Sequence, residues 1–421
     1  MRRGTNLLAV GGFNQAVILD RIRRAPAGLS RVEIAESTGL SAQTISNVSR
    51  RLLDSGIIRE GEKMNVGPGK PRTLLHLDPT GMYAIGVHLD PTVVTYVLLD
   101  LAGNVVTDHR APPPTGSPVP GGAPVTATPE QVIAAMAEQI EAILDRSAVP
   151  RDRVLGVGIA APGPVDAARG IVLNPPLLDG WMRVPLREAL AAATGLPVLL
   201  EKDVTAAAVA EIWTTDDRSR LRDNFAFFYY GTGIGMGLAL DREVLRGASD
   251  NAGDIGHIRV ASTGPLCSCG RHGCIGELVV PHYLVDLAIA ANLMPAPYEP
   301  LGPGAIDALF STLATAADTG SPAAVAILET TARHIAGAVV TITNLLDIDQ
   351  VVFGGPFWKR IAPIALPLIA ELVNGDPALI SPHIIHVSDS TIGDDVAAIG
   401  AGCLVLDHSL SPRPSALLIS E

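Results

Sequence analysis

The sequence predicts an α/β protein with a two-lobed body, preceded by a small winged helix-turn-helix. Hydrophobic residues form 48% of the 421 residues and aromatic residues only 4%, so the core must be built from Ala, Val, Leu and Ile, as is typical of α/β proteins. A strand-turn-strand pattern occurs twice, near residues 83–99 and 225–240, which indicates two similar halves with a cleft between them. The length fits about three domains of ordinary size.

The charge is divided unevenly along the chain. The formal net charge is -12, yet residues 1–76 hold 12 Lys and Arg against 6 Asp and Glu, and the remainder holds 19 against 37. A small basic module on a large acidic body is typical of a nucleic-acid binder fused to a part that must not bind nucleic acid. The apolar run at residues 7–10 is too short for a signal sequence and no run approaches a membrane span, so the cytoplasm is the expected compartment.

Three helices are expected near the N-terminus. The first covers residues 14–24 and carries Val17, Ile18 and Ile22 on one face. The second opens with a capping box, in which the side chains of Ser30 and Glu33 reciprocally satisfy free backbone amides, and it ends near Gly39. The third covers residues 42–55, and an apolar stripe at helical spacing turns one face inward. That stripe consists of Ile45, Val48 and Leu52.

The opposite face of the third helix suits insertion into the major groove of DNA. Short polar and amide side chains lie near its N-terminus and arginines follow a turn later, which allows base contacts flanked by phosphate contacts. Residues 57–77 then form a predicted hairpin with two cations at its tip, as in a wing. The alternative is a solvated amphipathic helix in an α-helical cap. The expected DNA-contacting residues are Gln43, Thr44, Ser46, Asn47, Arg50, Lys70 and Arg72.

The body is expected to repeat one plan of strands and helices. The first half has predicted strands at 83–88, 93–99, 105–108, 154–160 and 198–201, helices at 130–147 and 203–213, and a surface excursion at 111–129. The second half has predicted strands at 225–230, 235–240, 350–354 and 383–387, and helices at 281–291, 305–317, 322–346, 358–373 and 394–406. We therefore place the winged module at residues 1–78, the first lobe at 79–200 and the second at 201–394, with 395–421 able to return to the first lobe.

Metal-ligating residue types gather between residues 254 and 277. Cys267, Cys269 and Cys274 are three of the four cysteines of the chain, and His257 precedes them by ten positions. Thiolates and an imidazole brought together by glycine turns suit a closed, structural Zn²⁺ site that fixes a loop with little core of its own. A disulfide fits a reducing cytosol poorly, and a chance cluster of small apolar residues is the other alternative. His272 is a rival ligand, ranked below His257.

Six motifs occur in a set order along the chain. They are Ala-Pro-Gly-Pro-Val-Asp at 161–166, Glu-Lys-Asp at 201–203, Gly-Thr-Gly-Ile-Gly at 231–235, Gly-Asp-Ile-Gly-His at 253–257, the Cys-x-Cys-x4-Cys, and Val-Phe-Gly-Gly at 352–355. In this order they make the chain resemble the ROK family (repressors, open reading frames and sugar kinases) of the actin and hexokinase superfamily, in its regulator form with an N-terminal winged helix. The resemblance covers about residues 14–406. It implies an actin/hexokinase-like fold that binds sugar in its cleft.

The resemblance also implies roles for particular residues. In the family's kinases an Asp at the position of Asp203 takes the proton of the attacking hydroxyl, and the zinc-bound His at the position of His257 contacts the sugar. Asp203 opens a helix, whose dipole would keep the carboxylate ionised; a plain helix cap is the alternative. Lys202 replaces the family's Asn, either as a ligand for an acidic or phosphorylated sugar or as a solvated residue. The implied effector site is Asn174, Lys202, Asp203, Asp254, His257 and Glu277.

The phosphate-binding part of the family pattern is altered. ROK kinases carry an Asp-x-Gly-Gly-Thr loop in the first hairpin, whereas residues 88–92 here read His-Leu-Asp-Pro-Thr. Asp90 places a negative charge beside the phosphates, and Pro91 has no amide to donate. Because phosphoryl transfer depends on positioning and charge neutralisation, we expect no kinase activity.

The expected function is a DNA-binding regulator, in the simplest case a repressor, of carbohydrate metabolism genes. Its expected partners are double-stranded operator DNA and a sugar or sugar-derivative effector. Because two winged helices would bind two DNA half-sites, a homodimer or a dimer of dimers is favoured. One alternative is an active ATP-dependent sugar kinase that carries a DNA-binding arm. Another is a constitutive DNA-binding protein whose zinc-bearing body only dimerises.

Overall fold

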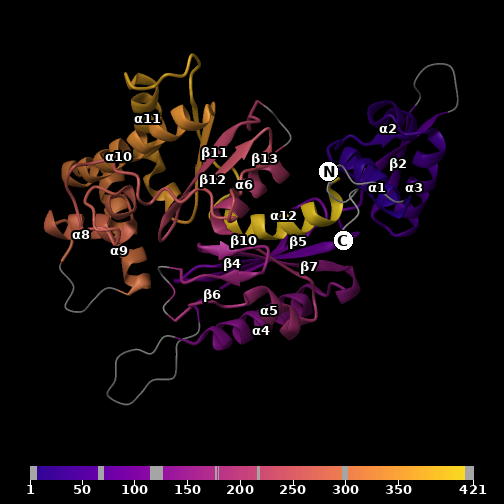
Figure 1. The fold of residues 1–421 in the computed structure, drawn as a ribbon, viewed down its shortest axis with the longest axis horizontal. Helices are drawn as coiled ribbons and strands as arrows, with labels where there is room; N and C mark the ends of the chain where they lie inside the picture. The colour runs from indigo at the N-terminus through magenta and orange to yellow at the C-terminus, as the bar shows by residue number, and fades with distance from the viewer. Residues whose placement is uncertain are drawn as a thin grey trace.

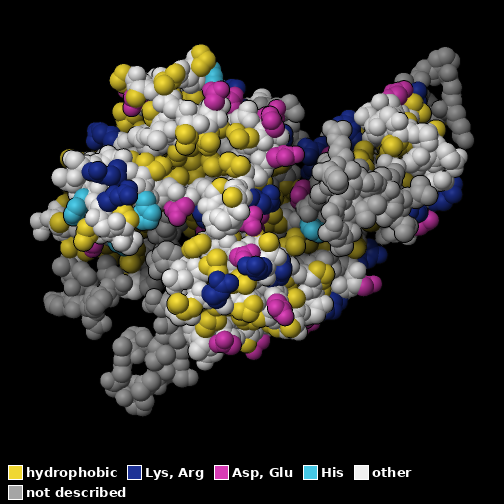
Figure 2. All heavy atoms as spheres, in the orientation of Figure 1, with side chains coloured by type: hydrophobic (Ala, Val, Ile, Leu, Met, Phe, Trp, Pro, Cys, Tyr) yellow, Lys and Arg dark blue, Asp and Glu magenta, His cyan; other side chains and the backbone are white. Residues whose placement is uncertain are grey.

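The computed structural model describes residues 7–64, 71–113, 127–175, 178, 180–215, 219–295 and 302–412. A winged module protrudes from one end of a two-lobed body (Figures 1 and 2). Each lobe contains a five-stranded mixed sheet, and two helices lie between the sheets. The predicted α/β class, the two lobes and the N-terminal winged helix-turn-helix are all confirmed.

The winged module consists of three helices and a three-stranded sheet of order β1-β3-β2. Its apolar core includes the predicted stripe residues Ile45, Val48 and Leu52, which pack with Ile18 and Ile22. The first helix is longer than predicted, since it starts at residue 7 rather than at residue 14. The elements are α1 (Leu7–Arg23), β1 (Leu29–Ser30), α2 (Arg31–Thr38), α3 (Ala42–Asp54), β2 (Ile58–Met64) and β3 (Arg72–Leu77).

The local signals of this module are realised as predicted. The Ser30 hydroxyl accepts from the Glu33 N–H at 3.3 Å and the Glu33 carboxylate accepts from the Ser30 N–H at 2.8 Å, so the capping box is closed. Gly39 ends α2 with φ 70°, a conformation that glycine adopts without steric cost. The predicted wing tip, including Lys70, lies outside the described residues.

The first lobe is built on a sheet of order β10-β7-β4-β5-β6. Strands β10, β7 and β4 are parallel, and β5 and β6 continue the sheet as antiparallel hairpins. Helices α4 and α5 cover one face. The elements are β4 (Tyr83–Leu89), β5 (Val94–Asp100), β6 (Val105–Ala111), α4 (Pro129–Ser147), η1 (Arg151–Arg153), β7 (Val154–Ala161), β8 (Val165–Asp166), β9 (Ile171–Val172), α5 (Leu186–Thr194) and β10 (Val198–Lys202).

The second lobe repeats this topology with a sheet of order β15-β14-β11-β12-β13. Strands β15, β14 and β11 are parallel, and β12 and β13 are antiparallel, so the predicted duplication is confirmed. The elements are β11 (Phe225–Tyr230), β12 (Ile234–Leu240), β13 (Glu243–Val244), α7 (Ile275–Leu278), α8 (Pro281–Ala290), α9 (Pro303–Asp318), α10 (Pro322–Leu346), β14 (Gln350–Gly354), α11 (Trp358–Gly375) and β15 (His386–Asp389).

Two helices, α6 (Asp203–Thr214) and α12 (Val396–Leu410), separate the two sheets (Figure 1). Helix α12 lies on β4, β5 and β7 of the first sheet, and α6 lies against α12, β11 and β12. Glycine makes this packing possible, since a Cβ at Gly158 would overlap the carbonyl oxygen of Ala401. The C-terminal helix therefore returns to the first sheet. The predicted boundaries at residues 78, 200 and 394 stay predictions.

Helix α10 corrects one expectation about membrane spans. Within the described residues it is the one helix long and apolar enough to cross a membrane by length and composition, and 50% of the relevant window is buried inside the protein. Its apolar residues pack against α7, α8, α9 and α11. The expectation that no run approaches a membrane span was therefore too strong, because a long core helix has the same composition.

Candidate functional site

A cavity of about 370 Å³ opens between the two lobes, within the size range of small-molecule pockets. Its walls come from the end of β4, the turn after β7, the start of α6, the β11–β12 turn and the loop that follows β13. Asn174 does not line the cavity; it is exposed, with φ 47°, so the geometry gives its predicted role no support. Five of the six predicted effector residues do line it: Lys202, Asp203, Asp254, His257 and Glu277.

Asp203 is the first residue of α6 and is half-buried at the cavity wall. Burial raises the pKa of its carboxyl group, whereas His88, Lys202 and a hydrogen bond from the Val204 N–H oppose that rise. Desolvation is the largest effect on this pKa, so it opposes the expected stabilisation of the carboxylate by the helix dipole. A carboxyl group with a raised pKa at the wall of a cleft is a candidate for proton transfer as well as for hydrogen bonding to a ligand.

Lys202 is buried, with 7% of its surface exposed. Its Nζ lies 3.4 Å from the carbonyl oxygens of Asn251 and Ala252, and within the described part of the chain no carboxylate pairs with it. The alternative of a solvated surface lysine is therefore wrong. A cation held in a cavity by weak carbonyl contacts is free to interact with a ligand.

The β4–β5 turn contains the residues that the resemblance places at the phosphate loop of the family's kinases. The Asp90 carboxylate accepts the Thr92 N–H at 2.8 Å and the Thr92 hydroxyl at 2.5 Å. Asp90 therefore occupies a backbone donor of its own turn, in addition to bringing a negative charge. The Thr232 hydroxyl of the β11–β12 turn donates to the same carboxylate at 3.4 Å, so Asp90 also links the two lobes.

Two residues in the cavity wall were not predicted from the sequence. Tyr229 is buried, its hydroxyl has no hydrogen-bond partner among the described residues, and burial raises its pKa well above the ordinary value, helped by Asp90 and Asp203. Its phenol therefore remains a hydrogen-bond donor. Asn251 bridges the lobes, since its side chain accepts from the Val165 N–H at 2.8 Å and donates to the Val165 carbonyl at 2.7 Å. No local sequence signal identifies contacts of this range.

The predicted metal ligands meet beside the cavity. The ligand atoms of His257, Cys267, Cys269 and Cys274 all lie within 4.8 Å of one another. The Cys267 sulfur lies 3.3 Å from His257 Nδ1, and the Cys269 and Cys274 sulfurs lie 3.6 Å apart. Tetrahedral zinc with Zn–S bonds of about 2.3 Å and Zn–N bonds of about 2.0 Å requires separations of roughly 3.5–3.8 Å. The two quoted contacts are close to these values and the largest separation is no more than 4.8 Å, so the four side chains could hold Zn²⁺.

A disulfide and a His272 ligand both suit the cysteine cluster less well. Cys267, Cys269 and Cys274 are free thiols rather than a disulfide. The rival ligand His272 is exposed, and its Nδ1 pairs with the Gly264 carbonyl at 2.8 Å, outside the cluster. A Zn²⁺ ion held by the four side chains would tie the loop after β13 to α7, and would place the His257 ring at the cavity wall.

The predicted DNA-contacting face of α3 is accessible. Gln43, Asn47 and Arg50 are exposed, whereas Thr44 and Ser46 are half-buried. The Gln43 side chain donates to the Asn47 amide oxygen at 3.0 Å, so the two amides are aligned on one face. Arg72, at the start of β3, is half-buried. The face has the shape and polarity of a recognition helix, and contact with DNA stays a prediction.

Comparison with known proteins gives one match for the winged module and another for the two-lobed body. The sequence pattern of winged helix-turn-helix DNA-binding domains matches residues 18–59, and that of the ROK family matches residues 84–408. A xylose repressor from Caldicellulosiruptor bescii is 24% identical over 388 residues, covering 91% of this chain and 93% of the repressor. A glucokinase from Streptomyces coelicolor is 31% identical over 276 residues, covering 64% of this chain and 81% of the kinase.

A solved structure shares the whole architecture. The crystal structure of a ROK family transcriptional regulator, described as a homolog of the Escherichia coli MLC protein, superposes with a TM-score of 0.74 at 23% identity and covers 96% of this chain and 98% of that one. This likeness shows the fold of the winged module and body together. With the family pattern extending over most of the body, the chain belongs to the ROK family, in the form that carries an N-terminal winged helix-turn-helix.

Proposed function

We propose that the protein is a sugar-responsive transcriptional regulator, in the simplest case a repressor, without kinase activity. One combination of features supports the proposal. The polar face of α3 is accessible, and the β4–β5 turn at the wall of the interlobe cavity is filled by the Asp90 side chain. A relative that covers nearly the whole chain is named a xylose repressor, which supports both halves of the proposal. The cytoplasm is the compartment in which such a regulator would meet DNA.

In this proposal the effector is a sugar or sugar derivative held by hydrogen bonds in the cleft. Asp203 and Glu277 would accept from hydroxyl groups, and Lys202 and the Tyr229 hydroxyl would donate. His257, oriented by Zn²⁺ through its other ring nitrogen, would contact the sugar from the second lobe. Because the cavity is built from both lobes, a bound sugar favours one separation of the lobes over others.

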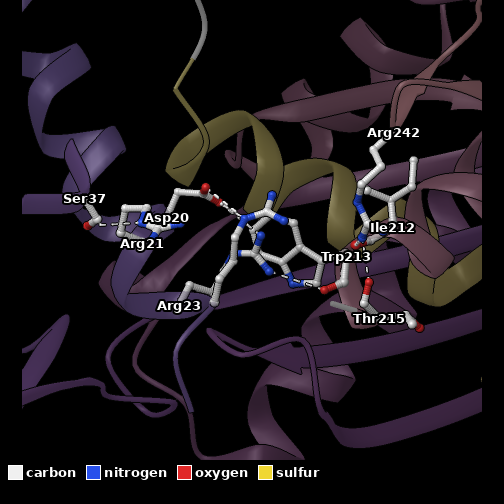
Figure 3. A network of polar contacts seen from close by, with 9 residues as sticks. Asp20, Arg21, Arg23, Ser37, Ile212, Trp213, Thr215 and Arg242 are labelled. Carbon is white, nitrogen blue, oxygen red and sulfur yellow. Dashed lines mark hydrogen bonds and ion pairs between the residues drawn. The ribbon is translucent and has the colours of Figure 1, made fainter. Parts of the chain in front are cut away.

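Helix α6 offers a direct path from the cleft to the winged module. It begins with Asp203 at the cavity and ends near Trp213, whose carbonyl oxygen accepts from the Arg23 guanidinium of α1 at 3.3 Å. Arg23 also stacks on the Trp213 ring, 4.0 Å from its centre (Figure 3). A shift of α6 on sugar binding would therefore move α1. In a homodimer or a dimer of dimers this would change the spacing of two recognition helices and their fit to two half-sites.

The test begins with DNA selected from a random library by the full-length protein. Gel-shift titration should give specific binding, which Arg50→Ala weakens at least tenfold, as expected for loss of a cation at the DNA surface, while the exposed control Arg146→Ala on α4 does not. A panel of hexoses, pentoses and their phosphates should contain a compound that changes the DNA affinity. DNA affinity that is indifferent to every sugar would refute the sensing half, and would favour the constitutive binder.

An ATP-dependent sugar kinase is the second candidate. Asp203 and the β11–β12 turn are retained, and one relative is named a glucokinase. A coupled assay of ADP release with the same sugar panel separates the candidates. Sugar-dependent turnover that disappears in Asp203→Asn would establish the kinase and overturn the proposal.

A further inference from the structure

A shallow groove with a volume of about 510 Å³ lies on the winged module, between α1 and α3 (Figure 1). We call it the α1–α3 groove. It is continuous with the predicted DNA-contacting face of α3, because three of its residues also belong to that face. The residues that line the groove are Asn14 of α1 and Thr44, Asn47, Val48, Arg50 and Arg51 of α3.

The groove is positively charged and open to solvent. Arg50 and Arg51 are both exposed, and neither makes an ion pair or a hydrogen bond within the described residues. No Asp or Glu of the described chain lines the groove. Two neighbouring guanidinium groups without a counter-charge repel each other, and an anion between them removes that repulsion. The groove therefore suits an anionic partner that approaches from outside.

Two amide side chains add hydrogen-bond donors beside these charges. The Asn47 amide oxygen accepts from Gln43 Nε2 at 3.0 Å, so the Asn47 NH₂ group is left to donate to a partner. Asn14 is half-buried, and its side chain makes no hydrogen bond within the described residues. Guanidinium and amide donors along the edge of a recognition helix are the groups that bind phosphate oxygens of DNA.

We propose that the α1–α3 groove binds the sugar-phosphate backbone of duplex DNA, beside the major groove that α3 enters. The proposal rests on the proposed function and adds α1 to the DNA-binding surface. Arg51 donates charge-assisted hydrogen bonds to a phosphate, and Asn14 donates to the same backbone from α1. Neither residue reads the base sequence. Contacts of this kind fix the position and orientation of a recognition helix on the duplex.

The first experiment uses the full-length protein and two duplexes of equal length, the duplex selected from the random library and one of unrelated sequence. Fluorescence anisotropy measures both affinities at several salt concentrations. Arg51→Ala should weaken binding to the two duplexes by a similar factor, at least about threefold, and should reduce the slope of log affinity against log salt by about one. Asn14→Ala should weaken both by about twofold or more without changing the slope, because the amide is uncharged.

The second experiment locates the contact on the DNA. Each phosphate of the selected duplex is replaced in turn by an uncharged methylphosphonate. At one or two positions beside the major-groove site, the replacement should weaken binding of the parent protein by at least about threefold. The same replacement should have little further effect on Arg51→Ala, because that variant has already lost the contact and the two changes are therefore not additive.

Arg59→Ala is the matched control. Arg59 is an exposed arginine of the same module, but it lines a cavity between the module and the body rather than the α1–α3 groove. Its loss removes the same charge, and both affinities should change by less than about twofold. Asn14→Asp should weaken binding more than Asn14→Ala, because a carboxylate would then face a phosphate. Thermal unfolding of each variant shows whether it is folded.

The outcomes separate this proposal from the proposed function. If the protein binds neither duplex, both are overturned. If it binds DNA and Arg50→Ala weakens binding, but folded Asn14→Ala and Arg51→Ala bind like the parent protein, only the α1–α3 groove is overturned. The groove is also overturned if Arg51→Ala weakens binding to the selected duplex alone, since Arg51 would then contact bases rather than the backbone.

Discussion

The two halves of the body share a strand order but differ in the turn that joins their first two strands. In the second half, the Gly231 N–H donates to the Gly233 carbonyl at 2.9 Å, and the Thr232 hydroxyl donates to Asp90 rather than to its own turn. In the first half, the Asp90 carboxylate occupies the Thr92 N–H, and Pro91 has no N–H to offer. The same fold thus supports one turn with a free backbone and one turn filled by a side chain, so we expect phosphate binding to depend on a few turn residues rather than on the fold.

The halves also differ in their candidate metal ligands, and metal removal should produce the largest effect. The loop between β13 and α7 has the predicted Zn²⁺ ligands, and the first half has no matching cluster among the described residues. Cys267→Ser, or chelation, should lower the free energy of unfolding by several kcal/mol, because metal binding is folding energy for such loops. Hydrogen exchange should accelerate in the second half before the first. Exposed Ser268→Ala is the control, and a chelator without effect on stability would contradict the prediction.

Glu211 lies on α6, the helix between the two halves, and its burial there should make the stability of the protein depend on pH. Burial raises its pKa to about 7, so below pH 4.5 it is protonated in both folded and unfolded states. As pH rises towards 7 the unfolded state loses this proton first, so stability falls. Glu211→Gln should remove that slope and increase stability at pH 8 by about 2–3 kcal/mol. Urea unfolding across pH 4.5–8 measures it, with exposed Glu371→Gln as the control. An unchanged slope in Glu211→Gln would show that this group does not cause it.

Replacing the filled turn should make the halves more alike. The double substitution Asp90→Gly and Pro91→Gly removes the negative charge and restores two free amides, so we expect MgATP affinity to rise about tenfold or more. Calorimetry with a non-hydrolysable ATP analogue measures it. Asp90→Asn, which removes the charge and keeps the side-chain cap, should give a smaller gain. If the double variant binds no better than the parent protein, the turn is not what limits nucleotide binding.

The smallest effect should come from the contact between the two turns. Thr232→Ala removes one long hydrogen bond to Asp90, so the free energy of unfolding should fall by no more than about 1 kcal/mol. Thr232→Ser keeps the hydroxyl and should behave like the parent protein. Urea midpoints of the three proteins measure the difference. A loss well above this value would show that the turns contribute more to lobe closure than one bond explains.

Local signals in the sequence were sufficient for much of this description. The capping box at Ser30 and Glu33, the stripe on α3 and the cysteine spacing all involve residues within a few turns of chain, where geometry follows from backbone periodicity. The filled β4–β5 turn is of the same kind, because Asp90 and Thr92 are two positions apart. The order of motifs along the chain then predicted the family and its two-lobed fold.

Tertiary structure decided the features that depend on distant parts of the chain. The position of the loop at Asn251 decides whether Lys202 is buried or solvated. Burial, more than the place of Asp203 at the start of α6, sets the direction in which the pKa of Asp203 is shifted. Arg23 and Trp213 are 190 positions apart, so no periodicity predicts their contact or the cavity beside it. The sequence by itself determined the elements and the identity of the chemical groups. Desolvation and long-range packing, which exist only once the chain is folded, determined how those groups are charged, paired or left without a partner.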